Sequence, residues 1–359
     1  MHRSMMVLVG LASCVGPSSG ERIDDPPDAG VIDAPPSELA LPLTPPSPAA
    51  NPSSPAKIAL GRLLFWDPIL SGARTLACAT CHDPRFGYSD GRQTSIGTAR
   101  NAPTILDTAW NGAVLGHPIP VAEQAPMFWD NRARSLELQA RGPLTASNEM
   151  LGTEFTDQTI FPELVARLSG IPAYATQFEA AFGTSGITET RILQAIAAFE
   201  RTLTNPQTSY DRYVNGDTTA LTVQQQRGLR VLTENHCTNC HSGPMFSDYE
   251  LHELRVPDLP GAMHDAGDGA NRFRTPSLRN ITRTAPYMHD GVFAGFQQVF
   301  QFYFQATQNP VDPKLRGVRT PTPQEAPDVI ALFAALGDSP FDTSIPATVP
   351  SGLTPGGTP

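Results

Sequence analysis

Two short motifs place a pair of cysteines and a histidine at the same fixed spacing. The first lies in LACATCHDPRFGYSDG, residues 76–91, and the second lies in HCTNCHSG, residues 236–243. Their six residues are Cys78, Cys81 and His82 in the first motif and Cys237, Cys240 and His241 in the second. The pattern C-x-x-C-H attaches haem c, because two thiols bind the vinyl groups as thioethers and the next residue places an imidazole under the iron. The sequence therefore predicts two covalently bound haem c groups, with the two histidines as proximal ligands.

Two other chemistries use a C-x-x-C spacing. A thioredoxin-like dithiol needs no histidine after it, and a zinc site normally pairs two such motifs a few tens of residues apart. Here Cys78 and Cys237 are 159 positions apart, and each motif carries its own histidine. Both observations favour haem. Two haems in one chain predict a division of labour, with a second axial ligand at an electron-transfer haem and an open position at a catalytic haem.

The length of the chain indicates how many domains it can form, and its net charge indicates which kind of partner it binds. The 359 residues suffice for two domains, and an apolar content of 40% is ordinary for a protein that buries a core. The formal net charge of −10 argues against a nucleic-acid partner and favours a basic one.

The fifth cysteine, Cys14, ends the segment MHRSMMVLVGLASC. A basic residue, a short apolar run and Leu-Ala-Ser-Cys resemble the lipobox of bacterial lipoproteins, which predicts that Cys14 is lipidated. The alternative is an ordinary cleaved secretory signal. Either interpretation predicts export to the periplasm or cell envelope, and the lipobox predicts that a lipid anchor alone holds the protein to a membrane.

The elements that must position the motifs are mostly helical. Apolar residues recur at helical spacing over residues 55–67, 156–170, 171–183, 188–203, 222–237, 295–304 and 322–338. Few strand-like alternations occur, so we predict a mainly α fold of two cytochrome c-like haem domains with long loops. The predicted organisation is a signal peptide at 1–14, a disordered tether at 15–54, haem domains at 55–210 and 211–340, and a disordered tail at 341–359.

Beyond the two motifs, residues 55–340 resemble the bacterial di-haem cytochrome c peroxidase family, including its MauG-like branch. The blocks that carry the resemblance are GRLLFWDPILSG, CATCH, GYSDGRQTSIG, RNAPTILD, FWDNRARSLELQARGPLTASNEM, FERTL, CTNCHSGPMFSD and TPSLRNITRTAPYMHDG. The resemblance implies that the first haem binds peroxide and that the second exchanges electrons with a donor.

The resemblance also assigns residues around the first haem. Gln139, Pro143 and Glu149 match the family's distal glutamine, proline and glutamate. Cleavage of peroxide needs a base near one oxygen that returns the proton to the other, and Glu149 is the candidate. Without the resemblance, a lone glutamate in a loop is a solvated surface charge. Trp129 matches the tryptophan between the haems, whereas its alternative role is ordinary core packing.

Two positions depart from the peroxidase pattern. Thr98 stands where many members carry a histidine that blocks the first haem, so we expect that iron to be open from the start. Tyr303 stands where the peroxidases place a methionine ligand of the second haem, and MauG-like members use tyrosine there. Met288 is an alternative thioether ligand, and Tyr303 could instead be a core aromatic.

The resemblance further implies a calcium ion held by Asn101, Thr284 and Pro286, with waters completing the oxygen shell. The leading hypothesis is an exported peroxidase that reduces hydrogen peroxide with electrons from a small c-type cytochrome or copper protein, and a homodimer is compatible with it. The alternatives are a MauG-like oxidase that modifies a partner protein and a tethered electron carrier without catalysis.

Overall fold

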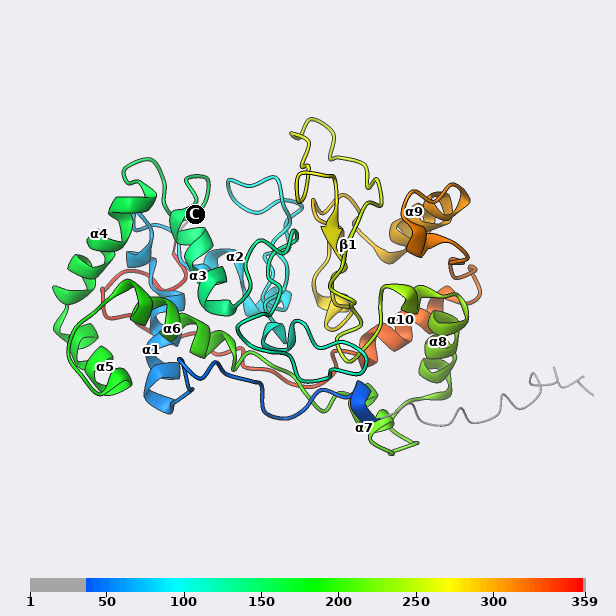
Figure 1. Cartoon of the computed structure of the whole chain (residues 1–359), viewed down its shortest axis with the longest axis horizontal. Helices are drawn as coiled ribbons and strands as arrows, with labels where there is room; N and C mark the ends of the chain where they lie inside the picture. The colour runs from blue at the N-terminus through cyan, green and yellow to red at the C-terminus, as the bar shows by residue number, and fades with distance from the viewer. Residues whose placement is uncertain (1–36, 358–359) are drawn as a thin grey trace, which may run out of the picture. The chain divides into compact units, whose positions relative to one another are not determined.

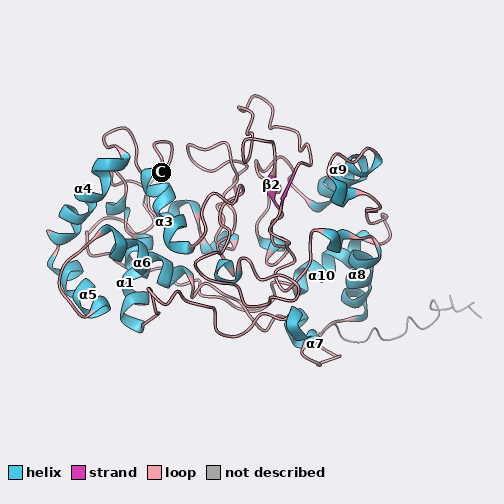
Figure 2. Ribbon diagram, viewed as in Figure 1, coloured by secondary structure: helices cyan, strands magenta, loops and turns pink. Residues whose placement is uncertain are grey.

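The computed structural model describes residues 37–357, so Cys14 and the predicted signal peptide lie outside the described residues. Within that range helices predominate, and the one pair of strands is β1 (Leu251–His252) antiparallel to β2 (Phe273–Arg274). Long loops connect the helices (Figure 2). The mainly α prediction is confirmed. None of the helices in residues 37–357 has the length and apolar character needed to span a bilayer.

Five helices lie in the first predicted haem domain. They are α1 (Pro55–Trp66), α3 (Leu136–Thr145), α4 (Asp157–Ser169), α5 (Pro172–Phe182) and α6 (Glu189–Glu200). The short helix α2 (Cys78–Cys81) carries the first cysteine pair. The apolar faces of these helices share one core, in which α1 packs against α6. A Cβ on Gly61 of α1 would lie 1.8 Å from the carbonyl oxygen of Ala195 on α6, so glycine permits this crossing.

Four helices lie in or at the edge of the second predicted domain. They are α7 (Ser209–Val214), α8 (Val223–Glu234), α9 (Phe296–Gln308) and α10 (Ala326–Ala335). Helix α8 packs against α10, where a Cβ on Gly228 would lie 2.1 Å from the carbonyl oxygen of Asp328. The second cysteine pair follows directly after α8. The predicted helices are therefore present, whereas α3 and α7 were not predicted as helices.

Buried polar residues join the two domains. The amide of Asn280 donates to the Asp107 carboxylate at 2.9 Å, and the amide of Asn205 donates to the side-chain oxygen of Asn280 at 2.6 Å. Burial raises the pKa of Asp107 to about 6. Nearby, Arg279 and Asp211 form a fully buried ion pair at 2.7 Å. These contacts place the loops around residues 107, 205 and 280 against one another at the junction of the domains.

The described terminal segments differ from the disorder predicted for them. Leu41 is buried and its backbone N–H donates to Asp211 at 3.0 Å. The chain after α10, red in Figure 1, returns to the first domain. There the hydroxyl of Ser351 donates to Asp67 at 2.6 Å, and the hydroxyl of Thr80, inside the first haem motif, donates to the carbonyl of Gly356 at 2.6 Å. These hydrogen bonds to distant parts of the chain thus hold both terminal segments in place, although the segments contain few apolar side chains.

Candidate functional site

A cavity of about 490 Å³ surrounds the first C-x-x-C-H motif. Its lining comes from α2, α3 and the last residue of α6, and from loops that include residues 263–266. Among the residues that border it are Cys78, Cys81, His82, Thr98, Trp129, Gln139, Pro143 and Glu149. The structure therefore brings together around one space the residues that the resemblance assigned to the first haem, although they lie far apart in the sequence.

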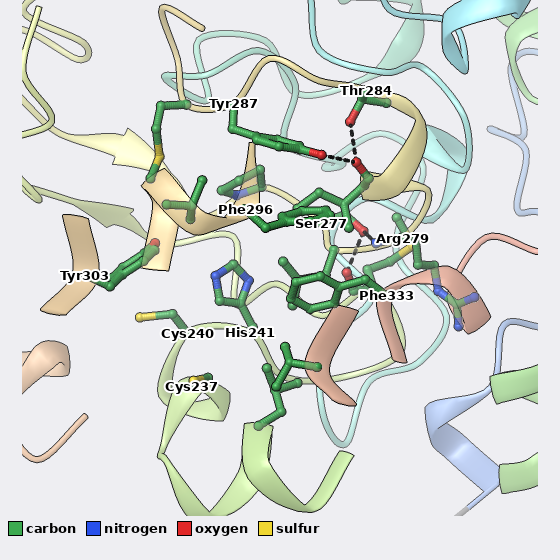
Figure 3. A pocket seen from close by; sticks show the side chains of 18 of the residues that line it. Cys237, Cys240, His241, Ser277, Arg279, Thr284, Tyr287, Phe296, Tyr303 and Phe333 are labelled. Atoms are coloured by element: carbon green, nitrogen blue, oxygen red, sulfur yellow. Dashed lines mark hydrogen bonds between the residues drawn. The ribbon is translucent and has the colours of Figure 1, made fainter. Parts of the chain in front are cut away.

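The second motif borders two adjoining cavities of about 190 and 360 Å³. Cys240, His241, Met288 and Tyr303 line both of them. Apolar side chains of α9 and α10, including Phe296 and Phe333, form much of the wall of the smaller cavity (Figure 3). A largely apolar slot with one histidine and two thiols at its edge has the chemistry that a haem requires.

The ring of each motif histidine is held by a hydrogen bond to a backbone carbonyl. Nδ1 of His82 lies 3.0 Å from the carbonyl oxygen of Tyr88, and Nδ1 of His241 lies 3.0 Å from that of Phe246. A carbonyl only accepts, so Nδ1 carries the proton and Nε2 keeps its lone pair for a metal. Burial lowers the pKa of both histidines, which favours this neutral form.

The two carbonyls are aimed by unusual backbone geometry. Tyr88 has φ of 59° and Phe246 has φ of 51°, in the left-handed region that bulky residues avoid. Such conformations cost free energy and persist where the surrounding structure imposes them. Their recurrence behind both histidines indicates that orienting the imidazole is the purpose of the strained turn.

The remaining polar groups fit two haems. The four motif cysteines form no disulfide with one another, so their thiols are free to form thioethers. Arg274 is buried, lines all three cavities and forms no ion pair within residues 37–357, and its Nε has no hydrogen-bond partner. A buried guanidinium requires an anion. The propionate carboxylates of a haem supply one, and the residues present therefore fit the predicted cofactor.

The wall that carries Glu149 is fixed by close backbone contacts. Gln139 lies on α3, and Glu149 follows it in a loop whose Met150 carbonyl accepts from the N–H of Gly72 at 2.8 Å. A Cβ on Gly97 would lie 1.9 Å from the carbonyl oxygen of Asn148, so the loop of Thr98 sits directly against the loop of Glu149.

The polar groups of this wall are available to a ligand. Oε1 of Gln139 is buried without a hydrogen-bond partner among the described residues. Burial raises the pKa of Glu149, although Arg132 and Arg100 oppose the shift. The hydroxyl of Thr98 donates to the carbonyl of Arg100 at 2.8 Å, so it is occupied by the backbone. This wall offers a carboxyl group and an amide to the cavity and no imidazole from position 98.

Trp129 lies where the cavities of the two motifs approach each other, because it lines all three. Its indole N–H donates to the carbonyl of Asn101 at 3.0 Å, and its own carbonyl accepts from the N–H of Arg274 at 2.7 Å. The indole is thus bonded to Asn101 and the backbone of the same residue to Arg274.

Tyr303 projects from α9 into the second site. In Figure 3 its hydroxyl faces the space beside the His241 ring. Burial raises the pKa of Tyr303, so the hydroxyl keeps its proton unless a cation binds it. Met288 lines the same cavities, so the structure leaves both predicted ligands within the site.

The three residues predicted for calcium also gather. Asn101, Thr284 and Pro286 all line the smaller cavity of the second site. The side-chain N–H of Asn101 donates to the carbonyl of Arg92 at 2.7 Å, which leaves the Oδ1 atom of Asn101 free to coordinate a cation. Calcium binding itself stays a prediction.

Sequence reasoning missed several residues of these sites. It did not identify the Tyr88 and Phe246 carbonyls, because no side-chain signal marks them. Arg274 and Glu200, which line the cavities, were also missed. Each is a charged residue in a partly apolar segment, and only burial distinguishes such a residue from a surface charge.

Comparisons with known proteins agree with this geometry. The model of the family described as "Di-haem cytochrome c peroxidase" matches residues 55–219. The methylamine utilization protein MauG of Methylophilus methylotrophus is 36% identical over 276 residues, which cover 72% of this chain and 75% of the relative. Cytochrome c551 peroxidase of Nitrosomonas europaea is 32% identical over 319 residues, which cover 84% and 86%.

A solved structure described as a MauG-like protein associated with microbial copper homeostasis is also similar. It superposes with a TM-score of 0.69 at 30% identity, over 83% of this chain and 94% of the other. The fold and the site thus define a di-haem enzyme. The chain belongs to the di-haem cytochrome c peroxidase family, and the prediction of two covalently bound haem c groups is confirmed.

Proposed function

We propose that this enzyme reduces hydrogen peroxide to water at the first haem, with electrons that enter through the second. One observation carries the proposal: Gln139, Pro143, Glu149 and Trp129 line one cavity together with the first C-x-x-C-H motif. The haem supplies the redox chemistry with peroxide, and the chain supplies orientation and protons.

Glu149 and Gln139 have complementary roles in this reaction. Reduction of one H₂O₂ to two H₂O consumes two electrons and two protons. Burial raises the pKa of Glu149, so its carboxyl group is suited to accept a proton from one peroxide oxygen and return it to the other. The unpaired Oε1 of Gln139 is suited to accept a hydrogen bond that orients peroxide.

The first site is expected to react without prior reduction. The hydroxyl of Thr98 is bonded to backbone carbonyls, and threonine is a poor haem ligand. Electrons are proposed to pass between the sites at Trp129, which borders both. The electron donor is proposed to be a small c-type cytochrome or copper protein, and the charge of −10 favours a basic one.

At the second site we propose that His241 and Tyr303 would hold the haem iron, with Met288 as the alternative to Tyr303. The position of Tyr303 on α9 favours a second candidate function, a MauG-like oxidase that modifies a partner protein. A tyrosinate is a hard anionic ligand that stabilises ferric iron. Tryptophan-modifying members place a tryptophan just before the second motif, whereas Asn235 and His236 stand here. We therefore favour peroxide reduction.

The remaining assignments extend from the family resemblance. We propose that Asn101, Thr284 and Pro286 bind calcium, that the protein acts in the periplasm or cell envelope, and that Cys14 carries a lipid anchor. A homodimer is compatible with the proposal.

The test mixes the purified di-haem protein, as isolated, with H₂O₂ in a stopped-flow spectrometer and then adds reduced cytochrome c. Glu149→Gln should slow the first spectral change by about 100-fold or more, since positioned acid–base groups contribute on that order. Glu154→Gln, which alters an exposed glutamate in the same loop, is the matched control and should react like the wild type.

Oxidation of cytochrome c after the first change supports the peroxidase. An intermediate that does not react with reduced cytochrome c supports the protein-modifying oxidase. Unchanged spectra even after half-reduction would overturn both candidates in favour of an electron carrier.

A further inference from the structure

Glu200 is a buried carboxyl group that the proposed reaction does not use. It is the last residue of α6, it is 3% exposed, and it lines the cavity of the first haem motif. Its Oε2 has no hydrogen-bond partner among the described residues. An ionised carboxylate without a donor is very costly in such a place.

The neighbouring cations do not neutralise it. Arg201 forms an ion pair with Glu137 on α3: its Nη2 donates to the Glu137 carboxylate at 2.9 Å, whereas its Nη1 lies 2.8 Å from the other carboxylate oxygen without making a hydrogen bond. Lys57 on α1 donates from Nζ to Asn51 at 2.9 Å and to the carbonyl of Pro52 at 2.8 Å. Lys57 is thus bonded elsewhere, and the charged groups that act on Glu200 are Arg201, which is already paired, and the anion Glu137.

The haem side of Glu200 adds no positive side chain. On that side the charge of Glu200 acts on the thiol of Cys78, which is consumed when a thioether forms. Burial raises the pKa of Glu200 to about 8, with Arg201 opposing the shift and Glu137 adding to it. At neutral pH the group thus holds a proton that it can release near physiological pH.

We propose that Glu200 is a proton-storing group of the first haem, which takes up a proton from solvent when that haem is reduced and releases it when the haem is oxidised. The ferric and ferrous forms differ by one positive charge, and the carboxylate is favoured by the more positive form. One electron from the second haem then enters together with one proton that binds a Glu200 carboxylate oxygen. Charge and protons balance in both directions.

The inference deepens the proposed function, because it rests on a haem in the first cavity and would supply part of the protons that peroxide reduction consumes. It does not require turnover. Potentials measured without peroxide therefore test Glu200 separately from the peroxidase activity.

The experiment is a spectroelectrochemical titration of both haems in the purified di-haem protein between pH 6 and 10. In wild type, the reduction equilibrium of the first haem should change about tenfold per pH unit around pH 8, which is about 59 mV for one electron. In Glu200→Gln this slope should disappear, while the second haem is unaffected. Glu189→Gln, which alters a half-buried glutamate on the same helix that pairs with Arg141 at 2.9 Å, is the control and should keep the slope.

Glu149→Gln is measured as well, because Glu149 lines the same cavity. A slope that is absent in wild type, or that survives in Glu200→Gln, overturns the proposal, and a slope lost only in Glu149→Gln reassigns the proton to Glu149.

If Glu200→Gln does not fold, a redox-difference infrared spectrum of Glu149→Gln takes its place. A protonated carboxyl band that grows on reduction supports Glu200. The absence of such a band contradicts it.

Discussion

Replacement of Asp211 by alanine should be among the most destabilising single changes in this protein. The Asp211 carboxylate is 2% exposed and accepts two hydrogen bonds from Arg279, at 3.1 and 2.7 Å. It also accepts from the N–H groups of Leu41 and Thr208, each at 3.0 Å. Removing one partner of a buried ion pair costs about 3–5 kcal/mol, and each buried N–H left without an acceptor adds about 1 kcal/mol or more. We expect a loss of about 5 kcal/mol in the free energy of unfolding.

The assay is chemical denaturation of the di-haem protein followed by far-UV circular dichroism. Asp217→Ala is the control, because Asp217 is exposed and bonds only locally to Thr219 and Ala220, so this change should lower the free energy of unfolding far less than Asp211→Ala. The double variant Asp211→Asn with Arg279→Met should lose less than the sum of its single changes, because no buried charge is left unpaired. Equal losses for Asp211→Ala and Asp217→Ala would refute the reasoning.

Two further predictions concern helix packing and pH. Gly228→Ala should cost about 1–3 kcal/mol in a thermal or denaturant melt, since its Cβ would meet the Asp328 carbonyl at 2.1 Å, whereas Gly170→Ala, with its nearest atom at 3.4 Å, should be near neutral. The pKa of Glu200 is raised from 4.5 to about 8 on folding, so the folded state holds a proton that the unfolded state has lost and stability falls as pH rises between these values. Glu200→Gln should therefore have a free energy of unfolding up to about 5 kcal/mol above that of the wild type at pH 9, and a similar one at pH 5. Equal free energies of unfolding at pH 9 would show that the ionisation of Glu200 does not destabilise the folded state.

The helices and the haem motifs could be predicted because their signals are local. Apolar spacing fixes a helix such as α10, whose Val329, Leu332 and Phe333 are buried as expected. The C-x-x-C-H spacing fixes the chemistry of the motif without knowledge of the fold. Neither signal depends on residues distant in the sequence.

What the sequence could not show depends on distant contacts. The segment after α10 has the composition of a disordered tail, yet Ser351 and Gly356 bond to Asp67 and Trp66 of the first domain. Glu200 stands in an amphipathic helix and looks like a surface charge until the packing of α6 buries it. The amino-acid composition is a property of the segment by itself, whereas its burial depends on the distant segments that pack against it.

In both haem sites the motif histidine is held by a backbone carbonyl, whereas the other walls of the two sites differ. This difference is how one chain could host two roles. Behind His82 and His241 the same left-handed turn aims a carbonyl at Nδ1, so both imidazoles present the same lone pair. On its other walls the first cavity has Glu149, which can carry a proton, whereas the second has Tyr303 on α9. A group that moves protons suits bond cleavage, and a group that can bind a metal suits a closed electron-transfer centre. We therefore expect the proposed division of labour to depend on the loop after α3 and on α9, and exchanging residues there should change the role of a haem without changing its attachment.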